Sequence, residues 1–408
     1  MKIAFFLSNY PVFSETFITN EIFWLQKSKI EGKIWYEISE NKEKQPNSKN
    51  IKFSTKKIPY KILSKKNITL IIKAHFYWIK KNPIEYFKYI FIFPIKIKWI
   101  NIRSIIKAPL VANQLKKYNP DLIYNHDSDN AYYLALLCSK LNNIPLITIF
   151  HTYHLFHRVK KIKTKIKESD AVIFQSEYSK KYVEKQLKNS ILNKKLHVIS
   201  SAGIDTNFFK KKKDLFQKEK IIKLITIGRL EETKGFNFLI QAISILKKQN
   251  FKVKCKIVGD GSQKKKLINL RNSFNLIKEI NFLGKVPHNQ KLIKYLSEAE
   301  MFILPSVISQ TGDRDMQPNV VKEAMSMELL TIASRLGGIN EVISNKKNGF
   351  LLENTSPEYI ANKIKKVWLL SSKEKINIGT KARKTIINKF ESQKINQQLI
   401  SLFSKYEK

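Results

Sequence analysis

The sequence predicts an α/β protein made of two domains, each built on a parallel sheet with helices on both faces. Apolar runs of strand length alternate with helical patterns along most of the 408 residues, as expected when helices cover parallel strands. The alternation restarts after a charged, aperiodic stretch at 210–220, which is typical of a linker. We therefore expect one domain over 1–205, a second over 206–385, and a C-terminal helix within 386–408.

The individual elements follow from local patterns. The expected strands are, in chain order, Ile3–Leu7, Leu122–Tyr124, Leu146–Phe150, Ala171–Gln175, Leu196–Ile199, Ile222–Ile227, Lys254–Val258, Ile280–Leu283, Met301–Pro305 and Leu330–Ser334. Helical periodicity is clear over Phe236–Lys248 and Pro318–Met327, and Ile387–Tyr406 is expected to form one terminal helix. The apolar start of the chain is interpreted as a first strand and not as a signal peptide.

The composition is strongly basic. The chain has 75 Lys and Arg residues against 33 Asp and Glu residues, a formal net charge of +42. Such a charge attracts polyanions, either nucleic acid or an anionic membrane surface. Because lysine is spread along the whole chain and glycine is scarce, a bias in residue usage is an equally good explanation of the charge.

Cysteine usage and hydropathy narrow the class of protein. The two cysteines, Cys138 and Cys255, lie in apolar contexts and form neither a disulfide framework nor a metal-binding spacing. That usage fits a reducing cytosol. No apolar stretch approaches the roughly 18 residues of a membrane-spanning helix. The segment 60–107, however, mixes lysine with aromatic residues, which indicates either an interfacial membrane helix or ordinary helices with lysine stems along apolar surface.

The segment from Leu304 to Glu341 holds the most informative residues. Pro318 stands where a helix should begin, and proline suits the first helical position. The free N–H groups of Asn319 and Val320 would then point out of the helix start, where the helix dipole favours a pyrophosphate.

Two carboxylates accompany that helix start. Glu323 lies just over one turn further on, and its carboxylate can accept two hydrogen bonds from a ribose diol. Asp315 lies on the preceding loop, where it can bind sugar hydroxyls. Taken alone, Asp315 can equally be a helix-entry residue and Glu323 a solvated helix position.

Two glycine-containing turns follow other expected strands. Gly228 ends the strand before Arg229 and Lys234, whose cationic groups can hold phosphate oxygens. Gly259, Asp260 and Gly261 follow the next strand, either as a ligand-facing turn or as a simple strand–helix turn.

His151 ends a strand of the first domain, with His154 and His157 just beyond it. No carboxylate or cysteine lies nearby, so we expect no metal site there and interpret His151 as a hydrogen-bonding group. Ligands of open α/β sheets bind outside the carboxyl ends of the strands. Because His151, Gly228, Gly259 and Asp315 all lie at such ends, the sequence predicts one shared site.

These residues resemble the retaining glycosyltransferase family 4 of the GT-B fold, in which two Rossmann-like domains face a central cleft. The pieces that carry the resemblance are HVISSAGIDTNFF, IGRLEETKG, IVGDG, LGKVPHNQ, ILPSV, the carboxylate pair, SRLGGINEVI and NGFLLE, in that order. The opening SNYPVFSETFITNEI and the loop GDRDMQP resemble the exopolysaccharide branch, similar to colanic-acid-type transferases.

The resemblance implies a role for each candidate residue. The N-terminal domain would serve the acceptor and the C-terminal domain would bind the nucleotide sugar. Arg229 and Lys234 would hold the donor diphosphate, Asp315 would bind the transferred sugar and His151 would contact it. The remaining donor-binding residues would be Gly228, Asp260, Gly261, Met316, Gln317, Asn319, Val320 and Glu323.

The resemblance also implies the reaction. A sugar would pass from a nucleotide donor, a UDP-sugar or alternatively a GDP-sugar, to a glycan or lipid-linked glycan of a surface polysaccharide. No metal or other cofactor is expected. The protein would be cytoplasmic and peripheral at the inner face of the membrane. The family normally has two glutamates where this chain has Asp315 and Glu323.

Three alternatives stay open from the sequence. The charge is compatible with a nucleic-acid-binding or membrane-binding protein without transferase activity, although no known nucleic-acid module is present and no specific nucleic acid is expected. The same fold can hydrolyse or epimerise a nucleotide sugar. The aspartate at position 315 is also compatible with an inactive GT-B partner subunit.

Overall fold

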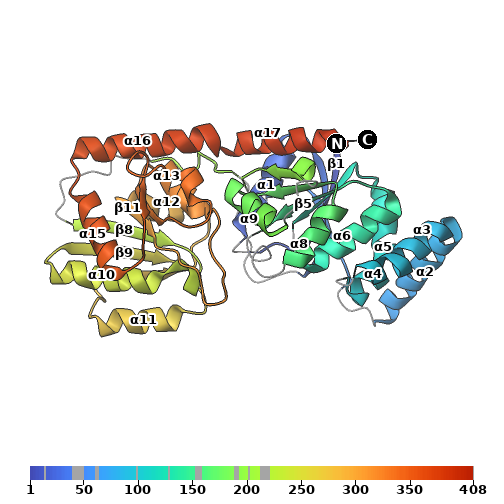
Figure 1. Ribbon diagram of the computed structural model, residues 1–408, viewed down its shortest axis with the longest axis horizontal. Coiled ribbons are helices and arrows are strands. Elements are labelled where there is room, and N and C mark those ends of the chain that lie inside the picture. Colours follow the sequence, from blue (N-terminus) through green and yellow to red (C-terminus); the bar gives the residue numbers. More distant parts are fainter. Residues whose placement is uncertain are drawn as a thin grey trace. The chain divides into compact units, whose positions relative to one another are not determined.

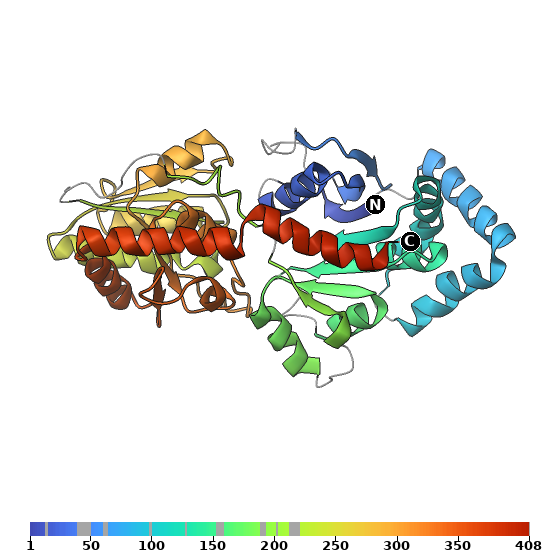
Figure 2. The ribbon, with the colours of Figure 1, turned by 90° about the horizontal axis from the view of Figure 1, so that it is seen from above.

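The computed structural model describes residues 1–12, 15–38, 50–59, 64–97, 100–126, 129–151, 159–187, 193–200, 203–211 and 221–407 (Figures 1 and 2). Two compact units divide the chain. Unit 1 comprises 1–175, 180–201 and 396–408, and unit 2 comprises 176–179 and 202–395.

Unit 1 contains a seven-stranded, entirely parallel sheet of order β3-β2-β1-β4-β5-β6-β7. Its strands are β1 Lys2–Asn9, β2 Glu31–Ile38, β3 Ser54–Lys57, β4 Leu122–His126, β5 Leu146–Phe150, β6 Ala171–Phe174 and β7 Leu196–Val198. The helices are α1 Thr16–Lys27, α2 Lys65–Lys81, α3 Pro83–Phe87, η2 Lys88–Ile92, α4 Phe93–Lys96, α5 Ile102–Tyr118, α6 Asp129–Asn142, α8 Val159–Glu168, η3 Asn193–Lys195 and α9 Glu177–Leu187, whose first residues belong to unit 2. The three strands β4 to β6 are buried along their whole length, because helices cover both faces of a sheet of this kind.

Unit 2 contains a six-stranded parallel sheet of order β10-β9-β8-β11-β12-β13. Its strands are β8 Ile221–Ile227, β9 Lys252–Val258, β10 Ile280–Gly284, β11 Met301–Leu304, β12 Leu330–Ser334 and β13 Phe350–Leu352. The helices are η4 Glu232–Lys234, α10 Phe236–Lys248, α11 Lys264–Ser273, α12 Gln290–Ser297, α13 Asn319–Ser326, α14 Ile339–Val342, α15 Pro357–Trp368 and α16 Ser372–Lys389. In Figure 1, α10 and α11 lie on one side of the sheet and α12 and α13 on the other.

The strand orders place a switch point in each sheet. In unit 2 the chain leaves β8 towards β9 on one side and later returns to β11 on the other. Helices on opposite faces diverge there, so a crevice forms at the carboxyl ends of the strands. The loops that begin at Gly228, Gly259 and Pro305 all leave this edge of the unit 2 sheet. The predicted α/β fold with two doubly wound parallel sheets is confirmed.

The prediction missed three strands. The strand β3 has the sequence STKK and is exposed along its length, so it carries no apolar pattern. Charged residues interrupt β2, and β13 has only three residues. Sheet pairing, and not local hydropathy, defines these strands.

The C-terminal segment and the start of α13 also differ from expectation. Instead of one helix over 387–406, α16 ends at Lys389 and α17 runs from Ser392 to Phe403, followed by the short turn η5 Ser404–Tyr406. The chain breaks between them because Glu391 pairs with Ile204 in an isolated bridge. Pro318 precedes the helix as its N-cap and is not its first residue. Of the expected linker only 210–211 are described, and His154 and His157 lie outside the described residues.

Candidate functional site

The turns after β8 and β9 interlock at the edge of the unit 2 sheet. A Cβ atom on Gly259 would lie 1.9 Å from the carbonyl oxygen of Gly228. A Cβ atom on Gly261 would lie 2.6 Å from the carbonyl oxygen of Leu230. The N–H of Leu230 in turn donates to the backbone carbonyl oxygen of Asp260 at 2.9 Å. Only glycine permits such close backbone approach, so these glycines fix the two turns against each other.

Two cations lie just after this contact. The side chain of Arg229 is exposed and has no hydrogen bond or ion pair with any described residue. Lys234 ends the short helix η4, which Gly235 terminates with a φ of 62°. A Cβ on Gly235 would lie 2.0 Å from the carbonyl oxygen of Pro305. The glycine therefore brings Lys234 against the loop that follows β11.

Asp315 on that loop contacts Lys234 directly. The Nζ atom of Lys234 lies 2.6 Å from Oδ1 of Asp315, and the hydroxyl of Ser306 donates to Oδ2 at 2.5 Å. The structure thus brings together two of the predicted residues and adds Ser306, which the sequence analysis missed. Ser306 is the second residue after β11, so the rule that ligand groups lie at strand ends would have found it.

The start of α13 presents polar groups without partners. Neither Asn319 N–H nor Val320 N–H donates to a described backbone or side-chain group. The Oδ1 atom of Asn319 and the Oε2 atom of Glu323 are both buried and have no hydrogen-bond partner among the described residues. Because Asn319 and Glu323 are four residues apart, they share one face of the helix. Buried polar atoms are nearly always paired, so this face is suited to a polar ligand.

Glu323 is buried rather than solvated. Burial raises the pKa of its carboxyl group, while His288 and Lys322 act in the opposite direction. The Nε2 atom of His288 lies 3.8 Å from Oε1. The preceding residue, Lys322, is also buried. Burial lowers the pKa of Lys322 to about 7, although the carboxylates of Glu323 and Glu341 act to raise it. The solvated-helix interpretation of Glu323 is therefore wrong.

Two adjacent glycines, Gly337 and Gly338, pack against the backbone that precedes α13. The N–H of Gly338 donates to the carbonyl oxygen of Met316 at 2.5 Å. A Cβ on Gly337, which has a φ of 60°, would lie 2.4 Å from the carbonyl oxygen of Asp315. The motif SRLGG thus supports the loop that carries Asp315.

Three other predicted residues have structural contacts of their own. The side chain of Met316 is buried, and the Gln317 side chain accepts a hydrogen bond from Lys322 Nζ at 3.2 Å. Asp260 accepts from the Gly261 N–H and pairs with Lys264 Nζ at 3.1 Å, and these contacts lower its pKa. Their side chains stabilise the turns around the site.

His151 in unit 1 belongs to a chain of polar contacts. Its Nδ1 lies 2.5 Å from Nε2 of Gln175, and its Nε2 lies 3.1 Å from Nδ1 of His126. The Nε2 of His126 is in turn 3.2 Å from Oε1 of the buried Glu21. If the Gln175 amide donates to His151 and His151 donates to His126, the proton of His126 is on Nε2, which lies beside the Glu21 carboxylate without the geometry of a hydrogen bond.

These polar contacts change the interpretation of His151. Both of its ring nitrogens already have polar neighbours, so the side chain is oriented by His126 and Gln175. The sequence analysis missed Glu21 and His126. His126 ends β4 as His151 follows β5, and the same strand-end rule would have indicated it; Glu21 lies inside α1 and carries no such signal. No group of three metal-ligating side chains occurs among the described residues.

The comparisons with known proteins match most of the chain. Residues 205–385 match the family described as "Glycosyl transferases group 1", and residues 69–208 match "Glycosyltransferase Family 4". A putative colanic acid biosynthesis glycosyltransferase of Escherichia coli is 29% identical over 182 residues, 44% of each chain. The amylovoran biosynthesis glycosyltransferase of Erwinia amylovora is 24% identical over 269 residues, 63% of this chain and 64% of that one. This chain spans about half the length of the curated relatives it matches.

Solved structures resemble the whole chain. A glycosyltransferase from Rickettsia africae has a TM-score of 0.72 at 19% identity, covering 99% of this chain and 98% of that one. Anabaena HepE in complex with UDP has a TM-score of 0.72 at 17% identity, covering 99% and 100%. At these identities the similarity establishes the fold.

Proposed function

Because this chain belongs to the family 4-type glycosyltransferases and has their GT-B fold, we propose that it transfers a sugar from a nucleotide sugar to a polysaccharide precursor. The family matches run from residue 69 to residue 385, and the relatives reported above are named as colanic acid and amylovoran biosynthesis glycosyltransferases. The proposal extends that activity and its residues to this chain.

The observation that carries the proposal is the buried Oε2 atom of Glu323, which has no hydrogen-bond partner among the described residues. Leaving a buried charged oxygen without a partner costs about 1–3 kcal/mol or more, so a ligand that donates two hydroxyls to it would be favoured. The neighbouring N–H groups of Asn319 and Val320 suit phosphate oxygens at the helix start. A diol and a diphosphate within one molecule describe a nucleoside diphosphate sugar.

The cations Arg229 and Lys234 supply the charge stabilisation that the reaction needs. In the proposed retaining reaction, the acceptor hydroxyl oxygen forms its bond to the anomeric carbon on the face from which the diphosphate leaves. The carbon–oxygen bond to the diphosphate breaks, and the departing phosphate oxygen takes the hydroxyl proton. Arg229 and Lys234 stabilise the negative charge that develops on that oxygen. Asp315 orients the transferred sugar, and His151 is proposed to assist it.

The donor is proposed to be a UDP-sugar, because the structurally similar Anabaena HepE has been solved in complex with UDP and with UDP-glucose. A thermal-shift series with UDP-, GDP- and ADP-glucose tests this, since a ligand that binds the folded protein raises its melting temperature. We expect the largest shift with the UDP-sugar. A chain that responds to none of the three contradicts the proposed function.

The acceptor is proposed to be lipid-linked, because α2 to α4 expose apolar stripes beside lysines. On α2, Ile68, Ile72 and Phe76 are exposed at intervals of four residues. From α3 to α4, four more exposed residues follow at intervals of three or four: Ile84, Phe87, Phe91 and Ile95. Residues 64–97 carry seven lysines and a single acidic residue, Glu85. Apolar stripes flanked by cations suit an anionic lipid surface at the inner face of the cytoplasmic membrane.

Flotation with vesicles tests this lipid contact. We expect the protein to float with vesicles that contain anionic lipid, and less at high salt. Replacing Phe87 and Phe91 by serine should reduce flotation, whereas replacing Ile277, an exposed apolar residue of unit 2, should not. Equal flotation of both variants contradicts the assignment. No described helix is long and apolar enough to cross a membrane.

A further inference from the structure

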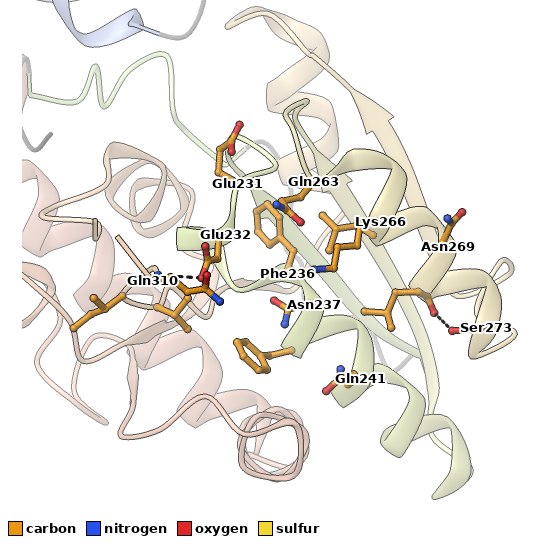
Figure 3. Close-up of a pocket in the computed structure, with 15 residues that line it drawn as sticks. Glu231, Glu232, Phe236, Asn237, Gln241, Gln263, Lys266, Asn269, Ser273 and Gln310 are labelled. Atoms are coloured by element: carbon orange, nitrogen blue, oxygen red, sulfur yellow. Dashed lines mark hydrogen bonds between the residues drawn. The ribbon is translucent and has the colours of Figure 1, made fainter. Parts of the chain in front are cut away.

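A groove lies between α10 and α11 on one face of unit 2, and its volume is about 930 Å³ (Figure 3). The volume is in the range of cavities that hold small organic ligands. The groove lies beside the loops of the proposed donor site, but none of the residues assigned to the donor lines it. The groove is therefore distinct from the proposed donor site.

Side-chain amides dominate the polar lining. They come from both helices and from two loops: Asn237, Gln241, Gln263, Asn269 and Gln310. Each amide offers one acceptor oxygen and two N–H donors, and none of these amide groups hydrogen bonds to another described residue. In Figure 3, Asn237 and Gln241 follow one helix, and Gln263 and Lys266 lie across from Asn237. Paired donors and acceptors of this kind match neighbouring hydroxyl groups.

Apolar surface lies among these amides. Phe238 and Leu270 pack partly against the unit 2 core and leave part of their side chains on the groove. Ile308 is 49% exposed at the groove margin. A sugar ring has hydroxyls at its edge and C–H groups on its faces, so alternating amide and apolar surface suits it better than it suits a purely apolar ligand.

The local charge of the groove is opposite in sign to that of the chain as a whole. The chain has 75 basic and 33 acidic residues, but the groove is lined by two acidic residues, Glu231 and Glu232, and one basic residue, Lys266. A phosphate-rich ligand would be repelled by the carboxylates. We infer that this groove binds an uncharged oligosaccharide, as a second carbohydrate site that needs no transfer reaction to operate.

The groove is physically continuous with the loops of the donor site. Glu232 Oε1 accepts a hydrogen bond from the Gln310 N–H at 3.2 Å, and the Val307 N–H donates to the Thr233 carbonyl at 2.9 Å. The next residues along the same two loops are Lys234 and Ser306, both in contact with Asp315. An oligosaccharide in the groove would thus be held beside the loops proposed to bind the sugar donor.

Saturation-transfer difference NMR on the whole chain without nucleotide tests the inference. The probes are maltotetraose, cellotetraose, mannotetraose and chitotetraose. We expect at least one to bind, and we expect the double variant Asn237→Ala/Gln241→Ala to bind it about tenfold more weakly, because two hydrogen-bonding groups are lost. Asn269→Trp, which fills the groove, should abolish binding. The matched control is Gln249→Ala, which removes an exposed amide at the end of α10 outside the groove.

The outcomes separate this inference from the proposed transferase function. Binding of none of the four probes by the unaltered chain overturns the inference, as does equal binding by all variants. The melting-temperature shift with a UDP-sugar, measured on the same samples, should be unchanged in the groove variants. If the UDP-sugar gives no shift while a tetrasaccharide still binds in the groove, the donor assignment is wrong and the inferred oligosaccharide site is supported.

Discussion

The Nζ atom of Lys234 lies 2.6 Å from Oδ1 of Asp315, although the two residues are 81 positions apart in the sequence. The contact joins the loop after β8 to the loop after β11, and Ser306 holds the other carboxylate oxygen. The cation proposed for the diphosphate and the anion proposed for the sugar are therefore neighbours. When a diphosphate binds, Lys234 has to share its charge between the phosphate and the carboxylate.

Asp315→Asn should separate these two roles. Without the carboxylate, Lys234 is fully available to phosphate and one nearby negative charge is gone, so we expect UDP to bind several-fold more tightly. The transfer rate should fall tenfold or more because the sugar loses a charged hydrogen-bond acceptor. Isothermal titration and single-turnover kinetics measure the two effects. Glu279→Gln, which disrupts the ion pair of Glu279 with Lys247, serves as the matched control. Weaker UDP binding in Asp315→Asn would contradict the pairing argument.

Removing both phosphate-directed cations should reduce turnover far more than removing two surface cations. We expect Arg229→Ala/Lys234→Ala to lower kcat by about 10²–10³ or more, since such groups stabilise charge that develops in the transition state. The control variant Lys247→Ala/Lys248→Ala changes the net charge equally at the far end of α10. Initial rates with a UDP-sugar measure both. Near-normal turnover in the first variant would rule out the assignment of Arg229 and Lys234.

Much of unit 2 could be predicted because local sequence specifies it. The helix Phe236–Lys248 agrees at both ends. The strand β11 is an unbroken apolar run, β8 is mostly apolar, and β9 alternates lysines with apolar residues. The site residues after these strands followed from topology, because parallel strands bring their carboxyl ends to one edge.

The rest depended on contacts between distant segments. Nothing near position 54 marks β3 as a strand, because pairing with β2 alone defines it. The supporting role of Gly337 depends on the carbonyl of Asp315, 22 residues earlier, and the chain from Glu21 to His151 crosses three elements of unit 1. Local patterns contain no information about such partners.

The linked contacts in unit 1 predict that Glu21 and His151 act as one group. We expect Glu21→Gln to lower kcat about tenfold and His151→Ala about tenfold or more, with similar melting temperatures. Since Glu21 contacts His126 and His126 contacts His151, a loss that passes through His151 should not add to its removal, and the double variant should be no slower than His151→Ala alone. A double-mutant cycle of kcat measures the coupling. Fully additive losses would show that the two residues act independently.

Lys322 predicts an unusual dependence of stability on pH. Burial lowers its pKa to about 7, although Glu323 and Glu341 oppose the shift, whereas in the unfolded chain the pKa stays near its ordinary value of about 10.4. Below pH 7 both states are protonated and the folded state bears the full cost of the buried charge. Between about pH 7 and pH 10 the unfolded chain binds more protons, so stability rises with pH.

The variant Lys322→Met has no ionisable group at this position. It should therefore be more stable than the unaltered chain at pH 6.5, by an amount on the order of a few kcal/mol, and this advantage should shrink towards pH 10. Urea unfolding followed by tryptophan fluorescence at several pH values measures the difference, and a difference that stays constant from pH 6.5 to pH 10 would show that Lys322 does not titrate in this range.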